Sequence, residues 1–207
     1  GKYALLQSQV VDRLTGTANR SRLHLMPTSG TRYYRWNGRR WTLVFAHDLS
    51  DEERAKAKEA LERNAREQGI WYSHAWGKRI EDRGSQITFS ALGQLAPIEA
   101  KEAWDPTDEK KRRLTQAVAA ELPELDVRPG GASSVDISQR GFDKSFAVRE
   151  LAGTLGMEVG RIVFIGDRME PGGNDYPAAL AGTRAVKVTG PADTVRLCDG
   201  IIAGLSR

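Results

Sequence analysis

The sequence of 207 residues predicts an α/β fold with an inserted α+β module. Two regions with different patterns of helices and strands lead to this prediction. After about residue 140 the chain reads helix, strand, helix, strand, helix, which is typical of helices layered on a parallel sheet. Between 46 and 140, alternating strands are interrupted by helices, as in α+β modules. We therefore expect a first core part over 1–45, an inserted module over 46–140 and a second core part over 141–207.

The first elements follow from apolar spacing and one turn signal. Apolar residues at helical spacing predict a helix over 3–14, and a short strand is expected over 22–26. Two β-prone runs, 31–36 and 39–45, flank Asn37-Gly38. Asn-Gly between such runs is the strongest short hairpin signal, so these runs should pair.

The inserted module should contain two amphipathic helices and several strands. Ser50 with Glu53 forms a capping box, and the helix it opens should end at Gly69. Asp105-Pro106 is expected to open the next helix, because proline is favoured at the first helical position. Strands are predicted over 70–76, 85–92 and 133–137.

The last third supplies the layered core. Asp143 should cap a helix that ends at Gly156. The apolar run 162–165 predicts a strand buried on both faces, as in a parallel sheet. A helix near 176–181, a strand over 185–188 and a helix over 194–205 complete the alternation.

Composition excludes several classes of protein. Hydrophobic residues are 40% and charged residues 28%, which is a globular balance. No segment approaches the ~20 apolar residues that a membrane helix needs, so no membrane association is expected. The single Cys198 excludes an internal disulfide and a cysteine-rich zinc site, and it fits a reducing, cytoplasmic location.

The net charge of +4 is interpreted as a mild excess spread along the chain, which favours no nucleic-acid partner. The densest basic run, 110–113, is expected on the solvated face of a helix. His24, His47 and His74 lack metal-type spacing. The tryptophans are expected in a small core or a dimer face, with stacking on a sugar or a base as the alternative. Monomer and homodimer both remain open.

The segment 164–175 carries the strongest chemical signal. Asp167 directly follows the apolar strand, and ligands of open α/β sheets bind outside the carboxyl ends of strands. The glycines at 172 and 173 let the loop return, so that Asp175 can approach the same point. Two converging carboxylates suit Mg²⁺, which prefers oxygen ligands. The alternative is that Asp167 begins a turn and Asp175 caps a helix.

Lys144 begins the helix that precedes this strand. A lysine at a helix N-terminus meets a mildly unfavourable dipole, which is tolerable at a surface and useful where the ammonium meets phosphate or a carboxylate. Taken alone, this pattern indicates a solvated lysine. The order of Lys144, a helix, a strand and then Asp167 favours a functional role.

The order Gly-Phe-Asp-Lys (141–144), helix, Ile-Gly-Asp (165–167) and Pro-Gly-Gly-Asn-Asp (171–175) resembles the haloacid dehalogenase-like phosphohydrolase superfamily. The spacing is most similar to the phosphomannomutase branch, which carries a type IIB cap. The resemblance implies a Rossmann-like core with an inserted α+β cap at 46–140. It also implies Mg²⁺ as the cofactor and a small phosphorylated substrate, such as a sugar phosphate.

Site residues transfer position by position from this resemblance. Lys144 would steady the nucleophile and the transferred phosphoryl group, Asp167 would hold Mg²⁺, and Asp175 would assist the metal directly or through water. Asn174 would support these residues without binding the metal itself. In the cap, the resemblance implies contacts to substrate by Arg83, Ser134 and Asp136.

Two departures from the family pattern affect the expected reaction. Gln94 stands where the mutase branch has a second cap arginine, which counts against a mutase that must clamp a bisphosphorylated sugar. The nucleophile motif Asp-x-Asp-x-Thr/Val is absent from the sequence. On this resemblance Gly1-Lys2 would follow a missing core strand, so we expect a longer parent polypeptide and an inactive 207-residue chain.

We therefore expect a Mg²⁺-dependent phosphohydrolase that acts on a sugar phosphate through an aspartyl-phosphate. A phosphomannomutase is the alternative within the family. A non-catalytic relative that serves as a binding module is the alternative from another class.

Overall fold

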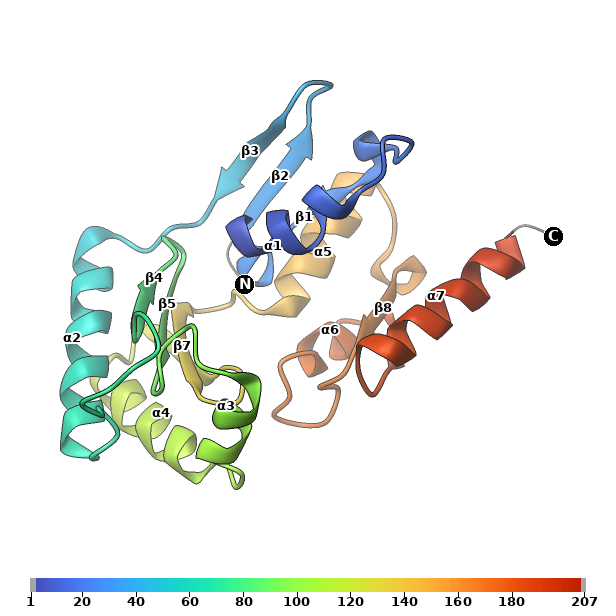
Figure 1. The fold of residues 1–207 in the computed structure, drawn as a ribbon. Helices are drawn as coiled ribbons and strands as arrows, with labels where there is room; N and C mark the ends of the chain where they lie inside the picture. Colours follow the sequence, from blue (N-terminus) through green and yellow to red (C-terminus); the bar gives the residue numbers. More distant parts are fainter. Residues whose placement is uncertain (1–2, 206–207) are drawn as a thin grey trace. The chain divides into compact units, whose positions relative to one another are not determined.

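The computed structural model describes residues 3–205 (Figure 1). They form two compact units that divide between Gly141 and Phe142. Gly1 and Lys2, which were expected to follow a missing strand, lie outside the described residues. Among residues 3–205, no helix combines the length and the apolar character needed to cross a bilayer.

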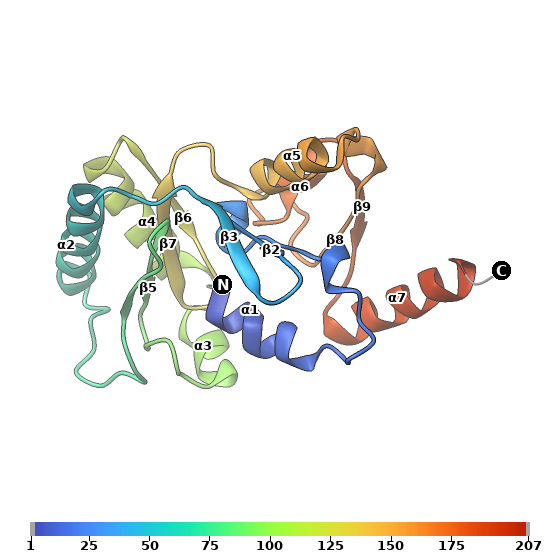
Figure 2. The same cartoon turned by 90° about the horizontal axis from the view of Figure 1, so that it is seen from above.

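The first unit is built around an antiparallel sheet in the order β4-β5-β7-β6. Its strands are β4 (Ile80–Asp82), β5 (Gln86–Ser90), β6 (Leu125–Pro129) and β7 (Ser134–Gln139). Helices α2 (Asp51–Glu67) and α4 (Glu109–Glu121) cover one face of this sheet (Figures 1 and 2). Between them lies the main apolar core, whose largest fully buried side chains include Phe89, Leu61, Ile87, Leu114 and Ile137.

The two covering helices begin in different ways. Ser50 and Glu53 form the predicted capping box of α2, and Gly69, with φ +71°, follows its end. Helix α4 begins at Glu109 rather than at Pro106, because the Asp105 carboxylate accepts from the backbone N–H groups of Lys110 and Lys111. The prediction placed that helix start too early.

Lys111 corrects the expectation of a fully solvated basic run. It is buried within α4, where its ammonium pairs with Asp108 at 2.5 Å and donates to the Gly131 carbonyl at 3.3 Å. Buried charges need such partners, because an unpaired ammonium pays the full cost of desolvation. Lys111 therefore anchors the loop between β6 and β7.

A smaller antiparallel sheet, in the order β1-β2-β3, also belongs to the first unit. It consists of β1 (His24–Leu25), β2 (Arg32–Trp36) and β3 (Trp41–Ala46). The predicted hairpin is confirmed, although only Gly38 has positive φ; Asn37 contributes its side-chain oxygen, which accepts from the N–H groups of Arg39 and Arg40. Helix α1 (Tyr3–Gln9) ends earlier than residue 14, and a 3₁₀ turn at 11–13 follows it.

The strand predicted over 70–76 is wrong. In this segment Trp76 N–H bonds the Leu92 carbonyl, and the Arg79 guanidinium takes the carbonyls of Tyr72 and His74. A side chain thus replaces the neighbouring strand as hydrogen-bond partner. Strands β4 and β6 and the short helix α3 (Ile98–Trp104) were not predicted.

The second unit has the predicted alternation. Helix α5 (Lys144–Leu155), strand β8 (Val163–Gly166), helix α6 (Tyr176–Leu180), strand β9 (Arg184–Lys187) and helix α7 (Pro191–Leu205) follow in order. Strands β8 and β9 pair in parallel, with Ile165 opposite Val186. The expectation that β8 is buried on both faces is wrong, since Val163 is 50% exposed and no residue of β8 is buried.

Candidate functional site

The second unit brings a cation and a carboxylate together at the carboxyl end of β8. The Lys144 ammonium, from the first turn of α5, hydrogen-bonds Oδ1 of Asp175. Oδ2 of Asp175 accepts from the backbone N–H groups of Asp167 and Arg168, both at 3.1 Å. The Asp175 side chain is 3% exposed, so these three donors replace water around it. We call Lys144, Asp167 and Asp175 the strand-end cluster.

Two glycines permit this arrangement. A Cβ at Gly166 would lie closer than 3.0 Å to the Asp175 carboxylate, and one at Gly173 would lie closer than 3.0 Å to the Arg168 backbone. Gly172 turns the loop with φ +87°. The loop therefore folds back onto the strand end because no side chain stands in its way.

Opposing effects set the charge of Asp175. Burial opposes ionisation, but the Lys144 hydrogen bond and the N–H groups of Arg168 and Asp167 outweigh it and lower the pKa of Asp175. Asp175 thus stays ionised and ties α5 to the loop. Although it occupies the backbone N-cap position of α6, its side chain makes no capping bond, so the helix-cap alternative does not describe it.

Asp167 and Asn174 differ from Asp175, because both side chains are exposed. Asp167 is the carboxylate of the strand-end cluster that remains open to a ligand from solvent. Within residues 3–205, no group of three or more His, Cys, Asp or Glu side chains is arranged to hold a metal ion. The cluster supplies a cation, one open carboxylate and a rigid strand end.

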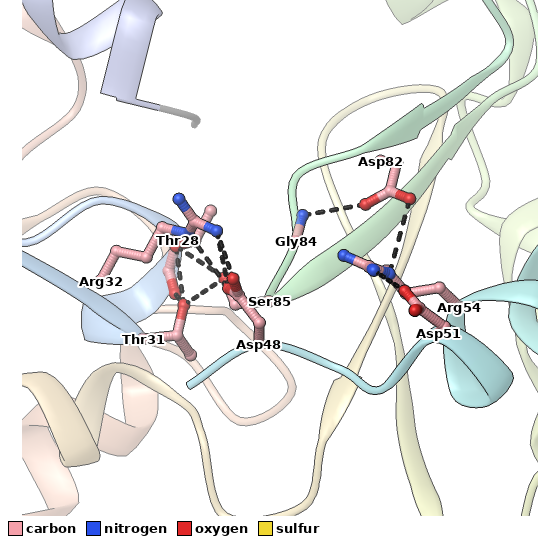
Figure 3. Close-up of polar contacts among 9 residues, drawn as sticks. All are labelled: Thr28, Thr31, Arg32, Asp48, Asp51, Arg54, Asp82, Gly84 and Ser85. Atoms are coloured by element: carbon pink, nitrogen blue, oxygen red, sulfur yellow. Dashed lines mark hydrogen bonds and ion pairs between the residues drawn. The ribbon is translucent and has the colours of Figure 1, made fainter. Parts of the chain in front are cut away.

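The candidate residues of the first unit lie on the polar side of its four-stranded sheet. Gly84 and Ser85 form the turn before β5 that carries Arg83, and Figure 3 shows how this turn is held. Ser85 accepts from Thr31 at 2.8 Å, and the Gly84 carbonyl accepts from Leu49 N–H at 3.1 Å. The turn that presents Arg83 is therefore fixed to the base of the β2–β3 hairpin.

Glycine is required at this turn for two reasons. Gly84 has φ +79°, and a Cβ there would lie closer than 3.0 Å to the Arg32 guanidinium and the Asp48 carboxylate. Arg32 and Asp48 form an ion pair at 2.6 Å beside it (Figure 3). The glycine that follows Arg83 thus has a local structural cause.

Arg83 itself is already paired. Its Nε donates to Glu81 at 2.8 Å and its Nη1 donates to Gln86 at 2.9 Å. Arg83 and Glu81 are 13% and 16% exposed, respectively, so this pair is shielded from water. The guanidinium charge is balanced within the protein.

Asp136 lies on the same polar side, opposite Thr88 of β5, whose hydroxyl donates to it at 2.6 Å. Burial raises the pKa of Asp136, and the Thr88 bond and the Arg83 charge offset this only in part. A Cβ at Gly130 would lie closer than 3.0 Å to both the Ser134 hydroxyl and the Asp136 carboxylate. The loop anchored by Lys111 therefore closes over Ser134 and Asp136.

Sequence reasoning missed the partners of these residues. Glu81, Gln86 and Thr88 share the polar face with Asp136, and their alternation with Ile87 and Phe89 was the available signal. Lys111 carried no such signal, because charged runs on helices are usually solvated.

A sequence model described as "Eukaryotic phosphomannomutase" matches residues 52–204, which is more than half of the chain. The chain is 32% identical to a phosphomannomutase of Spinacia oleracea over 133 residues, which cover 60% of this chain and 51% of that protein. It is 29% identical to phosphomannomutase 1 of Homo sapiens over 129 residues, 59% of this chain and 48% of that protein. The chain therefore spans about half the length of these curated relatives.

Solved structures support the fold. An IMP-bound mutant of a Plasmodium falciparum IMP-nucleotidase matches with a TM-score of 0.62 and 14% identity, over 97% of this chain and 52% of that chain. A protein of Streptococcus mutans matches with a TM-score of 0.58 and 13% identity, over 98% of this chain and 83% of that chain. These likenesses confirm the predicted α/β fold.

Proposed function

Because the chain belongs to the eukaryotic phosphomannomutase family, we propose that it forms part of a Mg²⁺-dependent phosphohydrolase that acts on a sugar phosphate. The observation that carries this proposal is the strand-end cluster, in which a buried, ionised Asp175 holds Lys144 beside the exposed Asp167. Such chemistry depends on positioning and on neutralising phosphoryl oxygens.

Each residue of the strand-end cluster has a separate task in this proposal. Asp167 would hold Mg²⁺, which supplies charge neutralisation to a phosphoryl group when bound. Lys144 would meet a phosphoryl oxygen or the nucleophile, and its hydrogen bond to Asp175 orients the ammonium. Both oxygens of Asp175 already accept hydrogen bonds, which favours an indirect role toward the metal, with Asn174 beside it.

We place the nucleophile outside this sequence, since no Asp-x-Asp occurs in it. Support comes from β8, which pairs only with β9 among the described strands and leaves apolar side chains exposed. A further strand on the free edge of β8 would complete the sheet and bring a carboxylate beside the strand-end cluster. We also propose that 1–45 and 141–207 belong to one core around a cap at 46–140, although the compact units of the structure divide only after Gly141.

Hydrolysis is favoured over mutase chemistry by the polar face of the cap. Arg83 is neutralised by Glu81 and Gln86, while the Nε2 of Gln94 is buried without a hydrogen-bond partner in the described structure. Neither residue offers an open cation to a second phosphate. Ser134 and Asp136 instead carry hydroxyl and carboxyl groups of a kind that suits sugar hydroxyls.

The second candidate is a phosphomannomutase, which the names of the curated relatives favour. This reaction would require Arg83 to leave Glu81 and bind phosphate when substrate enters. The two candidates therefore differ in what the Arg83–Glu81 pair does during turnover.

The deciding experiment uses the complete polypeptide encoded by the parent gene, incubated with sugar monophosphates with and without Mg²⁺. We expect release of inorganic phosphate that depends on Mg²⁺, and loss of nearly all turnover in Asp167→Ala. Glu170→Ala, in the same loop and exposed, is the matched control and should keep its rate. Isomerisation of mannose 6-phosphate without net phosphate release would establish the mutase instead, and a normal rate in Asp167→Ala would refute the metal role.

A further inference from the structure

The first unit contains a strongly basic segment that the proposed function does not use. Residues 13–47 hold seven arginines, no lysine and no Asp or Glu. The expectation that the positive charge is spread evenly along the chain is therefore wrong at this segment. Arginine without lysine is informative, because the guanidinium binds phosphate through a planar pair of donors and stacks on aromatic rings.

Two of these arginines have hydrogen-bond partners within the unit. Arg32 pairs with Asp48, and Arg35 bonds His24 and the carbonyls of Ser21 and Leu23. Arg35 thereby fastens the turn at 20–22 to strand β2. The turn is further fixed by Asn19, whose side-chain oxygen accepts from both the N–H and the hydroxyl of Ser21.

A hollow of about 350 Å³ lies between this turn and the tip of the β2–β3 hairpin. It is lined by Ala18, Asn19, Arg20, Ser21, Trp36 and Gly38. The Arg20 guanidinium lies over the Trp36 ring at 5.7 Å, and Trp36 meets Trp41 edge-on at 5.5 Å. We call this the hairpin hollow. Its size is at the lower end of the range for small-molecule sites.

More cationic groups belong to the segments that form the hollow. Arg22 is the last residue of the turn, and Arg39 and Arg40 follow Gly38 at the hairpin tip; all three residues are exposed. The nearest acids along the chain are Asp12 and Asp48, and Asp48 is held by Arg32. The local potential is therefore positive, which attracts an anion.

Aromatic and cationic groups together define the ligand chemistry. A guanidinium over an indole offers a donor pair for phosphate beside a surface for a planar ring. A sugar phosphate would use mainly the charge, whereas a nucleoside phosphate would also present a planar base that stacks on the aromatic ring. We propose that the hairpin hollow is a second ligand site, separate from the strand-end cluster, and that it binds a phosphate ester carrying an aromatic base.

The test measures binding of AMP to the full chain by isothermal titration calorimetry, with ribose 5-phosphate as the base-free comparison. AMP should bind saturably, and ribose 5-phosphate about tenfold more weakly, since stacking of one base contributes about 1–3 kcal/mol. Arg20→Ala and Trp36→Leu should each weaken AMP binding about tenfold. Arg112→Ala and Trp76→Leu change an exposed arginine and an exposed tryptophan outside the hollow, and they should leave AMP binding unchanged.

Further arms identify the source of the ligand and guard against misfolding. A short single-stranded oligonucleotide that competes with AMP and binds more tightly would assign a polymer as the source of the base and phosphate; weaker competition would assign a free nucleotide. Arg20→Lys keeps the charge but loses the planar donors, so it should fold normally and still bind AMP weakly. Lys144→Met tests the strand-end cluster and should not alter AMP binding.

Absence of saturable AMP binding would overturn the proposal. Equal binding of AMP and ribose 5-phosphate, or AMP binding that Lys144→Met abolishes and Arg20→Ala does not, would overturn it as well, because the ligand would then sit at the phosphoryl site. None of these results bears on phosphate release by the complete enzyme, so failure of this inference and failure of the proposed function are distinguishable.

Discussion

The two units of the chain reach an ordered structure in different ways. In the first unit a sheet is covered by α2 and α4, and Phe89, Leu61 and Ile137 are almost completely buried. In the second unit the sheet has two described strands, and α7 has no buried residue. Its buried apolar side chains are small, among them Val148 and Ala178, and they accompany the buried carboxylate of Asp175. The first unit thus has a large apolar core, while the second combines a smaller set of buried apolar side chains with the strand-end cluster.

A second contrast concerns one residue type in two environments. Asp175 is surrounded by an ammonium and two N–H groups, which lower its pKa against the effect of burial. Asp136 receives one hydroxyl bond at close range, and burial raises its pKa. Two largely buried carboxylates thus differ in charge preference because their hydrogen-bond donors differ. The anionic form of Asp175 is thus favoured, whereas the raised pKa of Asp136 favours its protonated form.

The largest effect should come from opening the core of the first unit. Phe89→Ala should destabilise that unit by about 3–5 kcal/mol, because a large buried side chain leaves a cavity. Ile202→Ala in α7, where the side chain is 61% exposed, should cost at most about 0.5 kcal/mol. Urea unfolding monitored by hydrogen exchange separates the two units. Equal losses of unfolding free energy in the two variants would contradict the contrast between the cores of the two units.

The next effect should come from the centre of the second unit. Asp175→Asn should destabilise it by about 2–4 kcal/mol, because Lys144 and two N–H groups lose their charged acceptor. Asp193→Asn, at a more exposed carboxylate of α7, should cost much less. Hydrogen exchange at residues 163–176 reports the change. Since the pKa of Asp175 is lowered, its contribution is present above the ordinary Asp pKa and is lost as pH falls through the folded value. The difference between the variant and the parent should therefore shrink in acid.

Two glycine-to-alanine substitutions in the second unit should change its stability in opposite directions, and together they test the packing at the end of β8. Gly166→Ala should destabilise the second unit by about 1–3 kcal/mol, because its methyl group would overlap the Asp175 carboxylate. Gly153→Ala, within α5 and with nothing within 4 Å of the new methyl group, should stabilise the unit by about 0.5–1 kcal/mol. Thermal unfolding of both variants gives the comparison. Destabilisation of equal size at both positions would show that crowding at Asp175 is not the cause.

The smallest effect should appear at Asp136. Because its pKa is raised on folding, the parent protein loses stability as pH rises through the folded value of Asp136. Asp136→Asn keeps an acceptor for Thr88 and cannot ionise, so its stability relative to the parent should rise over that pH range. Urea unfolding at several pH values measures this trend. A relative stability that falls with rising pH would mean that Asp136 is stabilised as an anion.

Local signals predicted much of this structure. The capping box at Ser50, the hairpin turn at Asn37-Gly38 and the glycines before Asp175 each act over a few residues, so their spacing is sufficient. The strand predicted over 70–76 does not form, because the guanidinium of Arg79 donates hydrogen bonds to carbonyl groups of this segment. The start of α4 was predicted too early, because Asp105 lies outside the helix and caps it through its side chain.

The candidate site divides in the same way. The approach of the Asp175 loop to Lys144 and to the end of β8 was predictable from their order along an α/β unit. The neutralisation of Arg83 by Glu81 was not, because it depends on the register of β4 against β5. The burial of Lys111 depends on the path of the loop at Gly131 and had no sequence signal. Long-range pairing therefore decided what sequence reasoning missed.

The most direct test of the central claim follows phosphate and sugar together in the complete enzyme. A mixture of sugar monophosphates that includes mannose 6-phosphate is incubated with Mg²⁺, and the products are resolved by phosphorus NMR. The strand-end cluster, with Arg83 already paired to Glu81, predicts accumulation of inorganic phosphate in the parent and none in Asp167→Ala. Phosphate release that persists in Asp167→Ala, or conversion to mannose 1-phosphate alone, would contradict the account.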